Sequence, residues 1–190
     1  MEKLLKQIEF IKEIDKLKYI QRKSKLFNSD RNENDAEHSW HLAMMVLVLG
    51  DHSNNNIDML KVLKMVLIHD IVEIDAGDVF IFDTTKDHTN TLEELKAAKR
   101  IFGLLPEEQA QEFIEVWLEF EEGKTNEARF AKAMDRFEPV LQNISNSGGT
   151  WAEHQVKHEK VINKTKIIEQ GSSVVWEYSK NQINQFFNVS

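Results

Sequence analysis

The side chains with the clearest capacity for chemistry are His69 and Asp70, which stand side by side at the end of the apolar run 62–68. Burying an imidazole and a carboxylate together is costly unless a charged group lies between them. A divalent cation would offset that cost. Adjacent side chains at the edge of a helix can reach one ion, and the negative end of the helix dipole favours a cation. We therefore predict a metal site at this pair.

Two further candidate ligands, His38 and Asp135, stand far away in the chain. The chain contains no cysteine, which excludes disulfides and leaves only nitrogen and oxygen atoms to hold a metal. Two imidazoles and two carboxylates suit Mn, Fe, Co, Ni or Zn, with positions left for water and phosphate oxygens. For any one buried histidine, a hydrogen-bonded core residue is the alternative interpretation.

The elements that must position these groups are predicted to be helices. Apolar periodicity, caps and glycine breaks indicate helices over about 2–20, 36–52, 57–75, 91–103, 106–123, 126–146 and 152–186, the last with a candidate interruption near Gly171. Asp35 is a candidate cap for the second helix, the polar segment 21–34 reads as a loop or broken helix, and 77–90 is looser. With two prolines and seven glycines, we predict an all-α fold: one compact helical domain over residues 1–190.

The composition limits the partners. A net charge of −8 argues against a general nucleic-acid surface, which needs clustered Lys and Arg. A small anionic substrate is still compatible, because a metal and a few local cations can reverse the field within a site. The N-terminus lacks the apolar core of a signal peptide, and no apolar run reaches the ~20 residues that span a bilayer. We expect no membrane partner and a cytoplasmic location.

The motifs around the candidate ligands resemble those of the HD-domain phosphohydrolases, and within them the 5′-deoxynucleotidases. The matching residues are Ala36-Glu37-His38-Ser39, His69-Asp70-Ile71-Val72-Glu73, Gly77-Asp78 and the distant Asp135. The resemblance covers about 15–145, whereas the C-terminal helical stretch 150–190 carries no motif. It implies an all-α, single-domain, homodimeric enzyme. Its activity would be the release of phosphate from deoxyribonucleoside 5′-monophosphates with a divalent ion such as Mn, Co, Fe, Ni, Zn or Mg.

The resemblance also implies roles for individual residues. His38, His69, Asp70 and Asp135 would hold the metal. Glu73 would be catalytic, either guiding a proton to the leaving group or holding a second metal. Asp78, turned toward the site by Gly77, would contact the substrate sugar or a metal, and Arg22 would clamp the phosphate with its two-pronged guanidinium. Well-studied relatives have a tryptophan after this arginine where this chain has Lys23, so the substrate preference stays open.

Alternatives to this activity are another HD phosphohydrolase that acts on a different nucleotide or phosphomonoester, and a non-catalytic nucleotide-binding or metal-binding module. Oxygenase chemistry is less favoured, because no histidine occurs between His69 and His88.

Other residues allow two interpretations each. His41 is predicted either to orient His38 or to belong to the core or a dimer contact, and Glu138 either to support Asp135 or to lie on the surface. Trp151 would close over a base or anchor the last helix. Pro139 is predicted to kink its helix near Asp135. His154 and His158, four residues apart, are most simply a solvated helix face.

Overall fold

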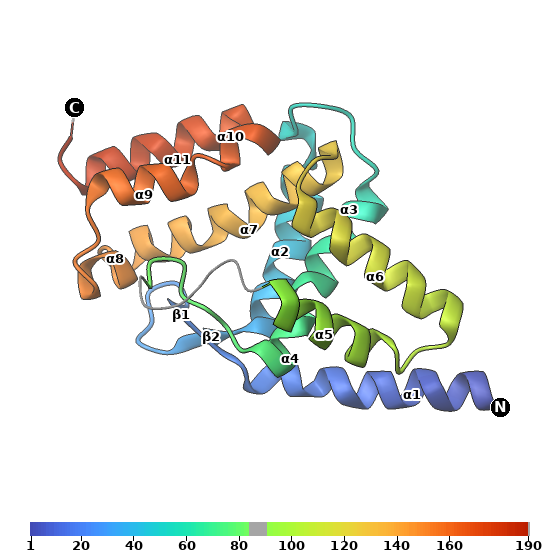
Figure 1. The fold of residues 1–190 in the computed structure, drawn as a ribbon. Coiled ribbons are helices and arrows are strands. Elements are labelled where there is room, and N and C mark those ends of the chain that lie inside the picture. Colours follow the sequence, from blue (N-terminus) through green and yellow to red (C-terminus); the bar gives the residue numbers. More distant parts are fainter. Residues whose placement is uncertain (84–90, 190) are drawn as a thin grey trace.

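The described part of the protein is mainly helical, with one small two-stranded sheet, and the predicted all-α class is confirmed. The computed structural model describes residues 1–83 and 91–189 (Figure 1). Its α-helices are α1 (Glu2–Ile14), α2 (Asp35–Leu49), α3 (Met59–Ile68), α4 (Glu73–Ala76), α5 (Thr91–Phe102), α6 (Glu107–Glu122), α7 (Asn126–Ser145), α8 (Gly149–Glu153), α9 (His158–Thr165), α10 (Ile168–Gly171) and α11 (Ser173–Phe186). Three short 3-10 helices are η1 (Asp15–Tyr19), η2 (Gly50–His52) and η3 (His69–Val72).

The segment 21–34 is a hairpin, so the prediction of a loop or broken helix was wrong. Strands β1 (Gln21–Lys25) and β2 (Asn32–Asn34) pair antiparallel, with Gln21 opposite Asn34. These strands are polar, and only Ser24 and Glu33 are buried. Two polar strands can pair through backbone hydrogen bonds without alternating apolar side chains. Because that alternation is what predicts a strand from sequence, the hairpin gave no signal.

Helix α2 begins one residue earlier than predicted, because Asn34 rather than Asp35 is its cap. The Asn34 side chain accepts a hydrogen bond from the Glu37 backbone at 3.0 Å, and the Glu37 side chain accepts one from the Asn34 backbone at 3.2 Å. This reciprocal capping box satisfies two backbone donors of the first turn. Asp35 is left free for a different role inside the protein.

The predicted helix over 57–75 is divided at the pair His69-Asp70. Helix α3 ends at Ile68, η3 covers the next four residues, and α4 ends before Gly77. All four residues of η3 are buried, which a helix lying on a core with one face cannot achieve. The tighter 3-10 segment therefore lies enclosed, and it carries His69 and Asp70 into the interior. The sequence also predicts a looser stretch over 77–90, and residues 84–90 of this stretch lie outside the residues that the structure describes.

Helix α7 is the central element of the core. It packs against α2, α3, α6, α10 and α11, and in Figure 1 it runs beneath the C-terminal layer of α9, α10 and α11. Its helical residues continue through Pro139, whose carbonyl accepts a hydrogen bond from the Asn143 side chain at 2.7 Å. The predicted kink stays a prediction.

The predicted helical stretch 152–186 is divided into several helices, with the expected interruption at Gly171. Gly171 packs so closely on α7 that a Cβ there would collide with the Arg129 carbonyl. His154 follows α8 and His158 begins α9, so the predicted shared helix face was wrong. Among the described residues, no helix is long and apolar enough to cross a membrane.

Trp151 on α8 anchors the C-terminal layer, one of its two predicted roles. It is buried, and its ring centroid lies 5.9 Å from that of Phe186 and 6.1 Å from that of Phe187.

Candidate metal centre

Three elements far apart in sequence bring the four expected ligands together. His38 comes from α2, His69 and Asp70 from η3, and Asp135 from α7. Asp135 Oδ1 lies 3.2 Å from His38 Nε2 and 3.7 Å from His69 Nε2. The Asp70 oxygens lie 3.1 Å from His69 Nε2 and 3.8 Å from His38 Nε2. The two ring nitrogens and Asp135 thus form one cluster, and the Asp70 carboxylate contacts both rings.

The imidazole of His69 is held in the orientation that a metal ligand needs. Its Nδ1 lies 3.1 Å from the Val66 carbonyl oxygen, which can only accept a hydrogen bond, so Nδ1 carries the proton. The lone pair of Nε2 then faces the carboxylates, and Nε2 is buried without a hydrogen-bond partner. A buried acceptor that faces other acceptors is costly unless a cation lies among them. The donor set therefore fits a divalent metal ion.

His38 is held from behind by two buried carboxylates. Its Nδ1 lies 3.3 Å from Glu138 Oε2 and 3.5 Å from Glu33 Oε2, and the exposed fractions of these residues are 0% and 1%. Glu138 Oε1 also lies 3.2 Å from His41 Nδ1. A carboxylate on the outer nitrogen of a metal-binding histidine fixes its tautomer and ring orientation. Glu138 was predicted either to support Asp135 or to lie on the surface. The structure favours a supporting role, but the ligand that Glu138 contacts is His38.

The charges around His38 and Asp135 favour a cation. Burial alone would lower the pKa of His38, as would the charge of Arg22, but Asp135, Glu138 and Glu33 raise that pKa well above its ordinary value. Burial would raise the pKa of Asp135, but the neighbouring His38 and His69 side chains hold that pKa well below its ordinary value. A field that stabilises a protonated imidazole in the interior stabilises a metal ion at the same place.

Arg22 lies beside this cluster, as the resemblance implies. It extends from β1, and its Nη1 donates to Asp70 Oδ2 at 2.9 Å and to Asp35 Oδ1 at 3.2 Å. Asp35 is fully buried. Burial raises the pKa of Asp35 to about 6, and the nearby charge of Asp70 adds to that rise. The residue predicted to cap α2 thus instead fixes Arg22 at the wall of the metal cavity.

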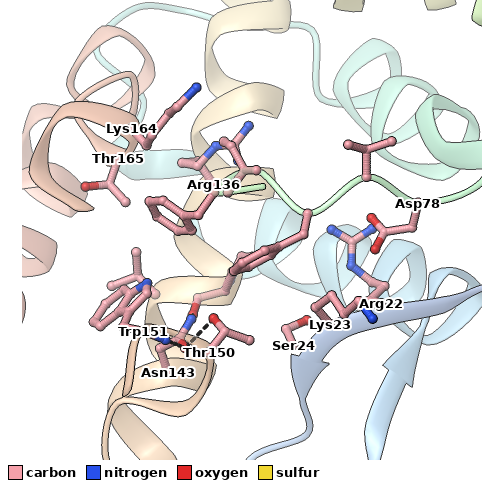
Figure 2. A pocket seen from close by; sticks show the side chains of 16 residues that line it. Arg22, Lys23, Ser24, Asp78, Arg136, Asn143, Thr150, Trp151, Lys164 and Thr165 are labelled. Atoms are coloured by element: carbon pink, nitrogen blue, oxygen red, sulfur yellow. Dashed lines mark hydrogen bonds between the residues drawn. The ribbon is translucent and has the colours of Figure 1, made fainter. Parts of the chain in front are cut away.

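Glu73 and Asp78 line the same cavity as Asp70 and Asp135. Burial raises the pKa of Glu73 well above its ordinary value, and the charges of Asp70 and Asp35 raise it further. Burial also raises the pKa of Asp78. Gly77 has φ +75°, a backbone conformation that favours glycine, and this turn directs the chain back along the cavity. Figure 2 shows the Asp78 carboxylate beside the Arg22 guanidinium.

An apolar pocket adjoins the metal cavity. Its apolar wall consists of Val79, Phe80, Ile81, Phe82, Pro139, Val140 and Trp151. The two cavities share Arg22, Asp78, Arg136 and Lys164 among their lining residues, so they form one continuous cleft. Figure 2 shows these four side chains in the apolar pocket.

Sequence reasoning missed three of these residues: Glu33, Arg136 and Lys164. Glu33 lies in an unpredicted strand and gave no signal. Arg136 directly follows Asp135, which was the available hint.

These observations identify the class of the protein, and comparison with known proteins agrees. A family model described as "HD domain" matches residues 14–176. The chain belongs to the HD-domain family, and the resemblance noted from its motifs is confirmed.

Individual relatives sharpen the comparison. A crystal structure of a predicted metal-dependent phosphohydrolase from Magnetospirillum magnetotacticum MS-1 superposes with a TM-score of 0.94 at 44% identity, covering 98% of this chain and 94% of that one. The 5′-deoxynucleotidase HDDC2 of Dictyostelium discoideum is 34% identical over 142 residues, which are 71% of this chain and 74% of that protein. Human 5′-deoxynucleotidase HDDC2 is 30% identical over 136 residues, 71% of this chain but 65% of its own length. The chain thus spans about two thirds of the length of the human relative.

Proposed function

We propose that the protein is a metal-dependent phosphohydrolase that releases phosphate from deoxyribonucleoside 5′-monophosphates. The observation that carries this proposal is the cluster of His38, His69 and Asp135, with Asp70 in contact with both imidazoles and with Arg22, in a cleft that continues into an apolar pocket. The relatives named 5′-deoxynucleotidase support the choice of substrate.

Substrate binding follows from the order of groups along the cleft. The phosphate would lie in the metal cavity, where Arg22 donates hydrogen bonds to its oxygens. Asp78 at the junction of the two cavities would accept a hydrogen bond from a sugar hydroxyl. The base would lie against the apolar wall near Trp151 and Phe80. One cleft would thus orient all three parts of a nucleotide.

Proton transfer would be the task of Glu73. Its pKa is raised by burial, so it holds a proton to a higher pH than an exposed glutamate and can deliver that proton to the departing 5′ oxygen. A divalent ion held by the four ligands, when bound, supplies Lewis-acid stabilisation of phosphate charge and a lower pKa for water.

The test is phosphate release from a panel of deoxy- and ribonucleoside 5′-monophosphates, with Mn²⁺, Co²⁺, Mg²⁺ or no metal added to metal-stripped protein. We expect release from the deoxyribonucleotides that depends on the metal and is lost in His69→Ala and Asp70→Ala. Release from other phosphomonoesters in preference to nucleotides would favour the alternative HD phosphohydrolase. Bound metal without any release would favour a binding module.

We also propose that two copies associate through α2. This helix is apolar on both faces: Leu42, Met45 and Val46 are buried in the core, whereas Trp40, Met44, Leu47 and Val48 are exposed. The exposed residues recur at helical spacing and form one stripe. A second copy of the same stripe would cover it in a two-fold symmetric contact.

A further inference from the structure

The two carboxylates expected to hold the metal each lie beside one guanidinium group. Asp70 Oδ2 accepts a hydrogen bond from Arg22 Nη1 at 2.9 Å, and Asp135 Oδ2 lies 3.7 Å from Arg136 Nη2. The other oxygen of Asp135 faces the two imidazoles. Figure 2 shows Arg136 extending from α7 and Arg22 from β1, so the two arginines reach the cleft from different elements. A phosphate bound at the metal would be within reach of both.

The positive charge of Arg22 is already offset in large part by the protein. Its Nη1 donates to both Asp70 and Asp35, and its Nε lies 3.9 Å from Glu33 Oε2. Asp35 and Glu33 are fully buried, so water screens these contacts little. Arg22 can still meet a phosphate oxygen, but three carboxylates share its single charge.

Arg136 has far fewer partners. Within residues 1–83 and 91–189, its one ion pair is the contact with Asp135, which at 3.7 Å is too long for a hydrogen bond. Its Nε is buried without a hydrogen-bond partner among the same residues. Its side chain is 28% exposed and lines both the metal cavity and the apolar pocket. The charge and the donors of this guanidinium are therefore available to a ligand in the cleft.

The charges around the metal cavity also favour a second cation for the substrate. Six carboxylates line this cavity, against the three cations Arg22, Arg136 and Lys164. A phosphate monoester carries about two negative charges at neutral pH, and a divalent ion offsets no more than that. Attraction of the substrate therefore depends on cations that the protein has not already paired. Of these, Arg136 lies at a metal ligand, whereas Lys164 is an exposed residue of α9.

We propose that Arg136 is a second phosphate-binding residue, which donates hydrogen bonds to phosphate oxygens from α7 while Arg22 does so from β1. This inference rests on the proposed function. During hydrolysis, negative charge is spread over the equatorial oxygens of the phosphorus, and both guanidinium groups stabilise it. A planar guanidinium can donate to two oxygens at once, which a lysine at this position could not do. Arg136 is then a catalytic residue, because it touches the substrate itself.

The experiment measures kcat/KM for deoxyadenosine 5′-monophosphate (dAMP) and the inhibition constant of inorganic phosphate, both at saturating metal. For Arg136→Met, which keeps an apolar stem of similar length, we expect kcat/KM to fall and the inhibition constant to rise by about 10- to 100-fold. Arg136→Lys keeps the charge without the two-pronged shape and should lose less than Arg136→Met. Arg129→Met is the matched control, because Arg129 is an exposed arginine of the same helix that lines neither cavity.

Metal binding distinguishes this role from a structural one. A positive charge 3.7 Å from Asp135 repels a divalent ion, so Arg136→Met should bind Co²⁺ or Mn²⁺ at least as tightly as the unchanged protein in a calorimetric titration. A residue that merely positioned Asp135 would, when removed, weaken the binding of the metal as well as that of phosphate.

Each outcome decides the question. A kcat/KM and a phosphate inhibition constant within about twofold of the unchanged protein overturn the inference and leave the proposed function intact. Metal binding that weakens as much as phosphate binding overturns it too. If the unchanged protein does not hydrolyse dAMP, the proposed function fails, and calorimetric titration of metal-loaded protein with inorganic phosphate decides the role of Arg136. Phosphate must then bind, and must bind at least about tenfold more weakly to Arg136→Met but not to Arg129→Met.

Discussion

The substitution Glu138→Gln should weaken metal binding without unfolding the protein. Glu138 is fully buried on α7, with Oε2 3.3 Å from His38 Nδ1 and Oε1 3.2 Å from His41 Nδ1. It also accepts a hydrogen bond from the Gln142 side chain. Burial would raise the pKa of Glu138, but hydrogen bonds from His38 and His41 lower it to about 2, so it is a carboxylate throughout the neutral range.

The magnitude follows from what the carboxylate does. Accepting from Nδ1–H keeps the proton on that nitrogen and leaves the Nε2 lone pair of His38 to face Asp135. Glutamine preserves the shape but not the charge, and its amide can donate to Nδ1 and move the ring proton to Nε2. Loss of such an outer partner typically weakens metal binding about 10- to 100-fold, which corresponds to about 1.4–2.8 kcal/mol.

The assay is a calorimetric titration of metal-free protein with Co²⁺ or Mn²⁺, which measures the dissociation constant of the metal. Circular dichroism confirms that the variant keeps its helical fold. Glu122→Gln is the matched control, because Glu122 is an exposed residue of α6 that pairs with Lys124, away from the metal centre. The reasoning is refuted if Glu138→Gln is folded and binds metal within about twofold of the unchanged protein, well short of the tenfold minimum.

Three further outcomes follow from the structure. Removing the metal with a chelator should abolish phosphate release and lower the free energy of unfolding. Adding metal at 100 times its dissociation constant should restore about 2.7 kcal/mol of that free energy, measured by urea unfolding. Trp151→Ala should lower the free energy of unfolding by about 3–5 kcal/mol, because the indole packs against Phe186 and Phe187 and its loss leaves a cavity; a loss below about 1 kcal/mol in denaturant melts would contradict that packing. Val48→Asp, at a position that is 71% exposed, should leave a single chain folded but shift the mass measured by light scattering from two chains to one; a dimer that persists would place the contact elsewhere.

The candidate ligands could be predicted because their residue types carry the signal. A histidine beside an aspartate after an apolar run is unusual whatever the details of the helix that holds it. The division of 57–75 into α3, η3 and α4 did not disturb this prediction, since all that mattered was that His69 and Asp70 stay at one end of a buried segment. The order of the motifs along the chain then identified His38 and Asp135 as candidate ligands of the same metal.

The supporting residues could not be predicted, because tertiary contacts alone define them. Asn34 and Asp35 are both good capping residues, and only the reciprocal bond with Glu37 decides between them. Glu33 is buried because its strand pairs with β1 and turns it toward His38. Neither backbone pairing of polar strands nor the choice between neighbouring caps appears in hydrophobic periodicity.

The net charge of the chain gives a poor guide to what its cleft binds. The carboxylates that line the metal cavity are Asp70, Glu73, Asp78, Glu93, Glu94 and Asp135, and Glu33, Asp35 and Glu138 lie close behind it. Among these carboxylates, Arg22 pairs with Asp70, Asp35 and Glu33. This excess of negative charge favours a divalent ion, and a bound ion then makes the same place attractive to a phosphate. Lys23, Lys157 and Lys160, which form no ion pair within residues 1–83 and 91–189, line a cavity on the far side of the apolar pocket. An acidic site can therefore attract an anion indirectly, through the metal ion that its carboxylates would hold.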